Sequence, residues 1–249
     1  MEKEKHRQTA YDGDDYRILY PEGFEKFFWN RFRAWKIGRL VRRFASGRIL
    51  DIGCGCGHIV KFLRERGFDA EGCELSPAAR PCSPEVAPFF YAGTDAGALP
   101  AAKREEFRTL LLLDVLEHIG EPEAFLENLL EKFVNCRCIL ITVPAFMKLW
   151  NPYADRGHCR RYTRESLAES LGQLPRLKTV RSGYFFHALY PAKLLCKGSE
   201  KRNRVEPVSG PAARAVNALA YAFFRVEDLL LPGSVGGSSL YAVIRVKRK

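Results

Sequence analysis

Glycines and charged side chains in this sequence gather just after apolar runs, where they could bind a ligand. Gly53, Gly55 and Gly57 stand at alternate positions directly after the run that ends at Ile52. A strand, a tight glycine loop and a helix bring backbone amides close to a nucleotide-like ligand. Glu74 ends the next apolar segment, and an acid about 20 residues past such a loop binds ribose hydroxyls. These residues therefore predict a nucleotide-like ligand site, although a plain strand-to-helix turn would also use such glycines.

Further reactive side chains follow two later apolar runs. Glu117 and His118 come after a run of leucines, and His158 and Tyr162 lie in the loop after another run. Histidine has a pKa that suits a general base near neutral pH. These four residues are therefore the candidate catalytic residues. His118 could equally be a hydrogen-bonded residue that starts a helix.

Two adjacent arginines, Arg160 and Arg161, precede Tyr162 in the same loop. A guanidinium presents paired donors that match a carboxylate or a phosphate, so both arginines are candidate substrate-binding residues. One of the two could instead brace the loop at the surface. The pair favours an anionic group on the substrate.

The elements that position these residues alternate between strands and helices. Apolar runs predict strands at 48–52, 69–73, 87–91, 109–113, 138–143 and 239–246. Apolar residues spaced by three and four predict helices at 27–44, 59–66 and 122–133. The continuous leucine run at 110–113 is typical of a central parallel strand that is covered on both faces. We therefore expect an α/β fold around a mostly parallel sheet.

The glycine spacing resembles motif I of the class I S-adenosylmethionine (SAM)-dependent methyltransferases. A dinucleotide-binding fingerprint needs its third glycine where this chain has His58. Asp-Val-Leu-Glu-His at 114–118 is similar to the end of the fourth strand in small-molecule methyltransferases. Gly-His-x-Arg-Arg-Tyr-Thr at 157–163 is similar to a string in a bacterial subgroup of these enzymes. Trp29 and Arg33 match an aromatic-basic pattern that precedes motif I in that subgroup.

The resemblance implies a Rossmann-like, seven-stranded, mostly parallel sheet sandwiched by helices, with a helical insertion at about 187–233 before the last strand. It divides the chain into an N-terminal helical cap, 1–46, and a class I methyltransferase domain, 47–249. It also implies SAM as the cofactor, with Asp95 bonded to the adenine amino group, although an Asx-type turn could use the same acid. The implied cofactor-binding residues are Asp51, Gly53, Cys54, Gly55, Gly57, Glu74, Leu75, Asp95, Ala96 and Asp114.

The resemblance further implies transfer of a methyl group to an oxygen or nitrogen of a small anionic or lipid-linked metabolite. Two alternatives stay open: a non-catalytic SAM-binding regulatory or partner protein, and an NAD-dependent oxidoreductase, which His58 disfavours. Quinone-precursor O-methyltransferases carry divalent-metal ligands where this chain has Asp114, Glu117 and His118. A divalent metal at these three residues is therefore an alternative, and we expect none.

Positive charge is concentrated in the last part of the chain. Residues 1–150 carry 22 Lys and Arg against 22 Asp and Glu, whereas residues 151–249 carry 18 against 7, which gives the whole net charge of +11. The sequence contains no recognisable nucleic-acid-binding module, so nucleic acid is not an expected partner. An anionic substrate, an anionic membrane surface or a solvated basic face would each account for this charge.

Two apolar segments, 183–198 and 211–233, flank a basic linker at Lys201 to Arg204. They predict a helical pair that packs on the domain, with interfacial membrane binding as the alternative. The longest uncharged run of the second segment has ten residues, 215–224, far below the roughly 20 of a transmembrane helix. The N-terminus has no signal-peptide pattern, so we expect a cytoplasmic protein, with peripheral contact at the inner membrane surface as an option.

The cysteine pattern argues against a zinc site. Cys54 and Cys56 lie within the glycine loop, and Cys136 and Cys138 are also two positions apart. Neither pair has the two-residue gap of a zinc knuckle. We therefore expect the eight cysteines to be reduced thiols that act as small apolar residues.

Overall fold

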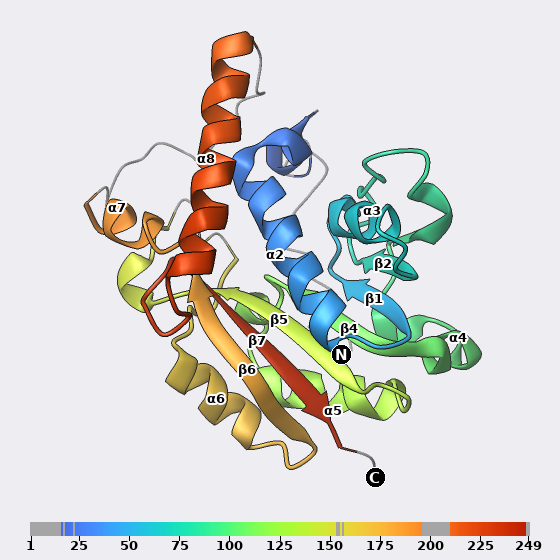
Figure 1. Ribbon diagram of the computed structural model, residues 1–249. Helices are drawn as coiled ribbons and strands as arrows, with labels where there is room; N and C mark the ends of the chain where they lie inside the picture. Colours follow the sequence, from blue (N-terminus) through green and yellow to red (C-terminus); the bar gives the residue numbers. More distant parts are fainter. Residues whose placement is uncertain are drawn as a thin grey trace.

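A seven-stranded sheet forms the centre of the computed structural model, which describes residues 16, 18–21, 23–152, 155, 157–195 and 210–247 (Figure 1). The strand order is β3-β2-β1-β4-β5-β7-β6. Strands β1 to β5 are parallel, and β7 runs antiparallel to both β5 and β6. The strands are β1 Arg48–Ile52, β2 Ala70–Glu74, β3 Phe90–Ala92, β4 Phe107–Leu113, β5 Cys138–Pro144, β6 Leu177–Phe185 and β7 Ser239–Val246. The predicted Rossmann-like, mostly parallel sheet is confirmed.

Helices cover both faces of this sheet. The α-helices are α2 Phe28–Phe44, α3 His58–Arg64, α4 Ala101–Glu106, α5 Pro122–Lys132, α6 Arg164–Gly172, α7 Leu189–Leu195 and α8 Pro211–Leu230. Short 3-10 turns are η1 Phe24–Lys26, η2 Ala87–Phe89, η3 Ala96–Ala98, η4 Leu116–His118 and η5 Met147–Leu149. Helices α2 and α8 lie side by side on one face, and α5 and α6 lie on the other (Figure 1).

Each face of the sheet has its own apolar core. Leu126, Leu129 and Leu130 of α5 pack with Leu167 and Leu171 of α6 against one face. On the opposite face, apolar side chains of α2 pack together with side chains of α3 and α8. They include Phe32, Ile37 and Val41 of α2, Leu63 of α3, and Phe224 and the partly buried Tyr221 of α8. Because β4 and β5 are buried on both faces, they read as continuous apolar runs rather than alternating ones.

The structure corrects two sequence-based expectations. The third strand begins at Phe90, because residues 87–89, which include Pro88, form a 3-10 turn instead. The sequence also gave no prediction for β6, and it assigned residues 183–185 to a helical segment, whereas they end this strand. Strand β6 lies at the sheet edge, and its central residues are exposed and partly charged. Their polarity removes the apolar run that marks the inner strands.

The predicted helical insertion before the last strand is confirmed. Helices α7 and α8 both lie between β6 and β7 in the chain. The basic linker at Lys201 to Arg204 lies outside the described residues. Among the helices that the structure describes, none combines the length and apolarity needed to cross a bilayer.

Backbone strain is concentrated at one edge of the sheet. Asp114, Phe146 and Phe186 have φ angles of 58°, 57° and 59°. Each follows the carboxyl end of a strand, namely β4, β5 and β6. Residues other than glycine adopt this left-handed region at a cost, and such positions cluster at functional sites. The carboxyl edge of the sheet is therefore the place to look for chemistry.

Candidate active site

The glycine loop at 53–57 joins β1 to α3 and lies at this carboxyl edge. Gly53, Gly55 and Gly57 have φ angles of 73°, 60° and 76°, which favour glycine. A Cβ at Gly57 would lie 2.9 Å from Val86, so a larger residue would also clash there. Glu74, at the end of β2, accepts the backbone N–H of Gly55 at 3.0 Å. The loop and the acid predicted to bind the cofactor are therefore in direct contact.

An aromatic row from the N-terminal part of the chain covers this loop. The rings of Tyr16, Tyr20, Phe24 and His58 follow one another with centroids 5.1 to 5.3 Å apart. The hydroxyl of Tyr20 lies against Gly55. Burial raises the pKa of both tyrosines, and for Tyr16 a hydrogen bond to Glu74 adds to this effect. This cover was not predicted from the sequence, although the spacing of four between Tyr16, Tyr20 and Phe24 could have indicated it.

The buried carboxylate of Asp51 tests whether the site fits SAM. Its Oδ1 atom has no hydrogen-bond partner among the described residues. Burial raises its pKa to about 8, and the charge of Arg33 opposes this shift. A ligand with a cationic ammonium group would satisfy this oxygen, because a buried carboxylate needs a donor or a positive charge. SAM carries such a group, so Asp51 and the glycine loop fit it.

The remaining predicted cofactor residues lie at the ends of β2 and β3. Leu75 directly follows Glu74, and its side chain is exposed and can cover an apolar ring. Asp95 accepts the backbone N–H of Gly97 at 2.7 Å, so it makes the Asx-type turn that the sequence analysis considered. Ala96 is buried next to it. The adenine role of Asp95 stays a prediction, since one carboxylate can accept more than one hydrogen bond.

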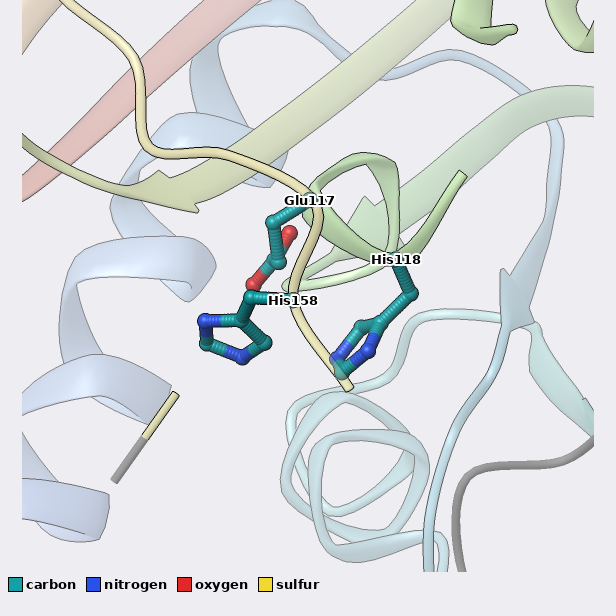
Figure 2. Close-up of side chains that lie close together, drawn as sticks. All are labelled: Glu117, His118 and His158. Atoms are coloured by element: carbon teal, nitrogen blue, oxygen red, sulfur yellow. The ribbon is translucent and has the colours of Figure 1, made fainter. Parts of the chain in front are cut away.

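Glu117, His118 and His158 form a second cluster at the same edge (Figure 2). One ligand atom from each lies within 4.8 Å of the others. Glu117 and His118 come from the turn η4 after β4, and His158 comes from the loop after β5. Glu117 is completely buried, and neither of its carboxylate oxygens has a hydrogen-bond partner among the described residues. Burial and the nearby charge of Asp114 raise the pKa of Glu117 well above its usual value.

Each of the two histidines in this cluster is oriented by a hydrogen bond at its own Nδ1 atom. The Nδ1 of His118 lies 3.0 Å from the carbonyl of Gly157, and the Nδ1 of His158 lies 2.8 Å from Asp155. The rings meet edge to face with centroids 4.6 Å apart. Burial, together with His158, lowers the pKa of His118. His118 is therefore neutral at pH 7 and can accept a proton or a metal ion.

Asp114, which was also a predicted cofactor residue, bonds to side chains outside this cluster. Its carboxylate forms an ion pair with Arg33 at 2.8 Å and accepts the hydroxyl of Thr142 at 2.9 Å. The sequence-based alternative grouped Asp114 with Glu117 and His118 as metal ligands. The structure instead brings His158 to these two residues.

The remaining predicted residues of the loop after β5 have internal partners. Arg161 is buried, and its guanidinium bonds both carboxylate oxygens of Asp155 at 3.0 Å. Arg160 donates to the carbonyl of Gly120. Tyr162 is buried, its hydroxyl is 3.4 Å from the carbonyl of Leu116, and burial raises its pKa to about 12. Arg161 therefore braces the loop that carries His158, and the substrate or catalytic roles of these three residues stay predictions.

Two aromatic side chains and a lysine, to which the sequence assigned no site role, form a contact group between α2, α7 and the end of β6. Trp29 of α2 stacks on Phe186 with ring centroids 4.0 Å apart. The Nζ of Lys193 lies 4.8 Å from the Trp29 ring. Burial, followed by the charge of Arg161, lowers the pKa of Lys193 to about 8. Phe186 is completely buried, so within this group only Trp29 and Lys193 are partly exposed and can contact a bound molecule.

Comparison with known proteins places the chain in a family. A model of the methyltransferase-domain family matches residues 29–174, more than half of the chain. The chain therefore belongs to the methyltransferase-domain family. The prediction of a class I SAM-dependent methyltransferase is confirmed at this level, and SAM is the cofactor of this class.

Two curated relatives share part of the sequence. The ubiquinone biosynthesis O-methyltransferase of Parvibaculum lavamentivorans is 35% identical over 95 residues, which cover 36% of this chain and 37% of that protein. The mitochondrial ubiquinone biosynthesis O-methyltransferase of Schizosaccharomyces pombe is 28% identical over 111 residues, 40% of this chain and 39% of that protein. The chain thus spans about two fifths of the length of the curated relatives it matches.

Solved structures share the fold over most of the chain. The plantazolicin methyltransferase BpumL in complex with SAH has a TM-score of 0.53 at 16% identity, over 94% of this chain and 88% of that one. The [4+2]-cyclase SpnF also has a TM-score of 0.53 at 16% identity, over 89% of this chain and 83% of that one. At this identity the likeness concerns the fold, and the reaction must be argued from the site.

Proposed function

We propose that this chain transfers the methyl group of SAM to a hydroxyl oxygen of a small acceptor that is anionic or lipid-linked. The observation that carries this proposal is a contact between the glycine loop, where the cofactor would bind, and the turn that holds the candidate base. A Cβ at Gly53 would lie 2.9 Å from Val115, so the glycine loop adjoins the turn that presents Glu117 and His118. Methyl transfer requires that the donor and the acceptor are bound next to each other.

The residues of the chain orient the reactants and remove a proton. SAM, when bound, would supply a methyl carbon that an oxygen lone pair can attack, with the thioether of SAH as the leaving group. Asp51, Gly55 and Glu74 would hold this cofactor. The carbonyl of Gly157 can only accept, so the Nδ1 of His118 carries the proton and its Nε2 is the basic atom. His118 takes the hydroxyl proton of the acceptor at this atom, because its lowered pKa keeps the ring neutral.

Two observations support this acceptor class. The curated relatives are named ubiquinone biosynthesis O-methyltransferases, which favours oxygen over nitrogen and a lipid-linked ring as the acceptor. Trp29 is partly exposed and lies beside the amine of Lys193, and an aromatic ring next to a cation suits an acceptor ring with an anionic group. A lipid-linked acceptor would bring a cytoplasmic protein into peripheral contact with a membrane surface. Nitrogen is the alternative atom for methylation.

A bound divalent cation is a second chemistry for the same cluster. It is favoured by the way both imidazoles use Nδ1 to bond a carbonyl or carboxylate, since metal-binding histidines are commonly oriented by such bonds. Two imidazoles and a carboxylate would suit Zn²⁺ or another transition ion better than Mg²⁺. Such an ion would satisfy the unpartnered carboxylate of Glu117. The ion would bind the acceptor oxygen and would lower the pKa of the acceptor hydroxyl. His118 would then be a ligand of the ion rather than the base.

Kinetics of the His118→Ala variant test the proposal. Labelled SAM is incubated with the protein and a lipid extract, and the labelled product is identified and then used as the assay. We expect turnover to fall by about 10²- to 10⁴-fold, the usual contribution of a general base. SAM affinity, measured by calorimetry, should stay unchanged. Glu121→Gln is a suitable control, because this acid is exposed at the start of α5.

Addition of a chelator distinguishes general-base catalysis by His118 from catalysis by a bound divalent cation. If His118 is the base, a chelator leaves turnover unchanged. If the cluster binds a cation, the chelator abolishes turnover and added Zn²⁺ or Mn²⁺ restores it. SAM binding without transfer to any component of the extract would contradict the proposal and favour a non-catalytic SAM-binding protein.

A further inference from the structure

Helix α8 turns its polar side chains toward the body of the protein. Asn217 accepts the backbone N–H of Phe28 at 2.5 Å and donates to the carbonyl of Lys26 at 2.5 Å. Glu227 accepts the backbone N–H groups of His187 and Ala188 at 2.9 and 2.6 Å. Asp228 pairs with Lys36 of α2 and is nearly buried. The hydrogen-bonding groups of this helix are thus used on its inner side.

The outer side of α8 is apolar. Its large exposed side chains, the apolar face of α8, are Val216, Leu219, Phe223, Val226, Leu229 and Leu230. Each of them is between 53% and 75% exposed. They recur every three or four positions, as the buried stripe of a surface helix normally does. Here that stripe points away from the core, and in the described part of the chain nothing covers it.

This apolar face is long and accessible. A helix of 20 residues is about 30 Å long. Helix α8 lies at the outside of the molecule, and its first turns project beyond the neighbouring elements (Figure 1). Leu195 at the end of α7 is a further exposed apolar residue, at 87%. A surface of this size on one helix indicates a binding partner.

The charges around the apolar face are positive. Helix α2, which lies beside α8, carries six Lys or Arg residues and no acid. The exposed cations of the two helices include Arg42 and Arg43 on α2 and Arg214 and Arg225 on α8. The two acids of α8 face inward, as their partners above demonstrate. The partner should therefore combine an apolar layer with negative charge.

We propose that α8 docks into an anionic membrane surface, with its apolar face in the headgroup boundary and the flanking arginines on the lipid phosphates. An amphipathic helix that lies in the plane of the membrane has this combination of an apolar face and basic flanks. A second copy of the chain fits less well, because it would bring a second set of cations against the first. The proposal goes beyond the methyl-transfer activity and stands whether the acceptor is soluble or lipid-linked.

Helix α8 also contacts the residues that directly follow β6. Glu227 of α8 holds the backbone of His187 and Ala188, which directly follow Phe186. Phe224 of α8 packs edge to face on Phe186, with ring centroids 5.1 Å apart. The aromatic pair of Trp29 and Phe186 is therefore attached to the membrane-facing helix through short contacts.

Vesicle sedimentation of the full chain tests the docking. The vesicles contain either phosphatidylcholine alone or equal parts of phosphatidylcholine and phosphatidylglycerol. We expect the protein to sediment with the anionic vesicles at low salt and at least tenfold less with the neutral ones. The double variant Leu219→Ser, Phe223→Ser should lower anionic binding at least tenfold, and Arg214→Glu should also weaken it. Val180→Ser, at an exposed valine of β6, is the matched control and should bind like the wild type.

Two results would overturn the proposal. One is wild-type protein that stays in the supernatant with anionic vesicles at low salt. The other is vesicle binding that the double variant retains while its far-UV circular dichroism and melting temperature match those of the wild type. A dimer seen by ultracentrifugation that the double variant dissociates, without any vesicle binding by the wild type, would assign the face to a second copy instead.

Discussion

Asp51 is a residue whose ionisation opposes folding. Its buried carboxyl has a pKa of about 8 in the folded chain, against an ordinary value of 3.8. The folded state therefore binds more protons than the unfolded state between these values, so the free energy of unfolding falls as the pH rises through this window. Asp51→Asn removes this titration. We expect the variant to be more stable than the wild type at pH 8 by on the order of a few kcal/mol, and little different at pH 4.

Calorimetric melting at the two pH values measures this difference. The same variant should bind SAM more weakly, because an amide cannot pair with the cofactor's cationic group as a carboxylate does. A gain in melting temperature that is equal at pH 4 and pH 8 would contradict the role of the buried charge. A surface change such as Glu121→Gln should leave both melting temperatures unchanged.

A second prediction about a single residue concerns Glu74. Its carboxylate already accepts the N–H groups of Gly55 and Ser76, and a SAM ribose would add a charge-assisted bond. Glu74→Ala should weaken SAM binding by about 1.5–3 kcal/mol, or roughly 10- to 100-fold. Glu74→Gln keeps one acceptor oxygen and should lose less. Calorimetric titration with SAM and with NAD measures this, and unchanged SAM affinity or tight NAD binding would exclude the assignment.

Residues in short motifs at strand ends were predictable, whereas isolated ones were not. Parallel strands end at the same edge, so Glu117, His118 and His158 could be expected near one another from sequence alone. Their roles in catalysis stay predictions. Phe186 and Lys193 belong to no motif: Phe186 directly follows β6, which the sequence did not indicate, and Lys193 lies on α7, a helix that was expected without a role for this lysine.

The loop after β5 is the element that positions His158. Asp155 lies at its centre and bonds both His158 and Arg161 while almost fully buried. Burial alone would raise the pKa of Asp155, but the hydrogen bonds from His158, the Asn151 backbone and Arg161 outweigh it and hold the pKa below its ordinary value. The loop therefore depends on a buried ion pair, because removal of either partner would leave the other as an unpaired buried charge.

Arg161→Ala tests this element. Removing one partner of a buried ion pair costs about 3–5 kcal/mol, which lowers the melting temperature by roughly 2–4 °C per kcal/mol in a chain of this size. Arg160→Ala removes only one bond to a carbonyl and should cost about 1 kcal/mol. Thermal melting of the two variants compares them. Equal effects of both substitutions would mean that the ion pair does not hold the loop.

Elements differed in how well the sequence predicted them. Inner strands such as β4 and β5 are apolar on both faces, and their runs were found. Strand β6 was missed because an edge strand exposes polar residues. Helix α8 was expected, but a helical pattern alone does not say which side faces the core. Only the contacts of Asn217 and Glu227 establish that its apolar side faces outward.

For the whole molecule, the division of the sequence into a neutral and a basic part corresponds to a division of the sheet between two sets of strands. The neutral residues 1–150 contain the strands β1 to β5 with the glycine loop and the cluster turn η4. The basic residues 151–249 contain β6, β7 and the helices α7 and α8. The first part resembles a known cofactor-binding half, so the sequence predicted it well. In the second part, β6 exposes polar residues and the helical pattern of α8 does not say which side faces the core, so this arrangement had to come from the structure.

Binding of the cofactor should stabilise the whole chain, because the glycine loop, β1 and β2 join one core with α2 and α3. A ligand that binds only the folded state adds about 2.7 kcal/mol at a concentration of 100 times its Kd. We expect SAM or SAH to raise the melting temperature by roughly 5–10 °C at that concentration, since each kcal/mol corresponds to about 2–4 °C in a chain of this size. NAD at the same concentration should leave it unchanged, because His58 stands where a dinucleotide loop needs glycine. Differential scanning fluorimetry measures all three ligands. A shift with NAD that equals the shift with SAM would contradict the assignment of the loop, and no shift with SAM or SAH would exclude the cofactor.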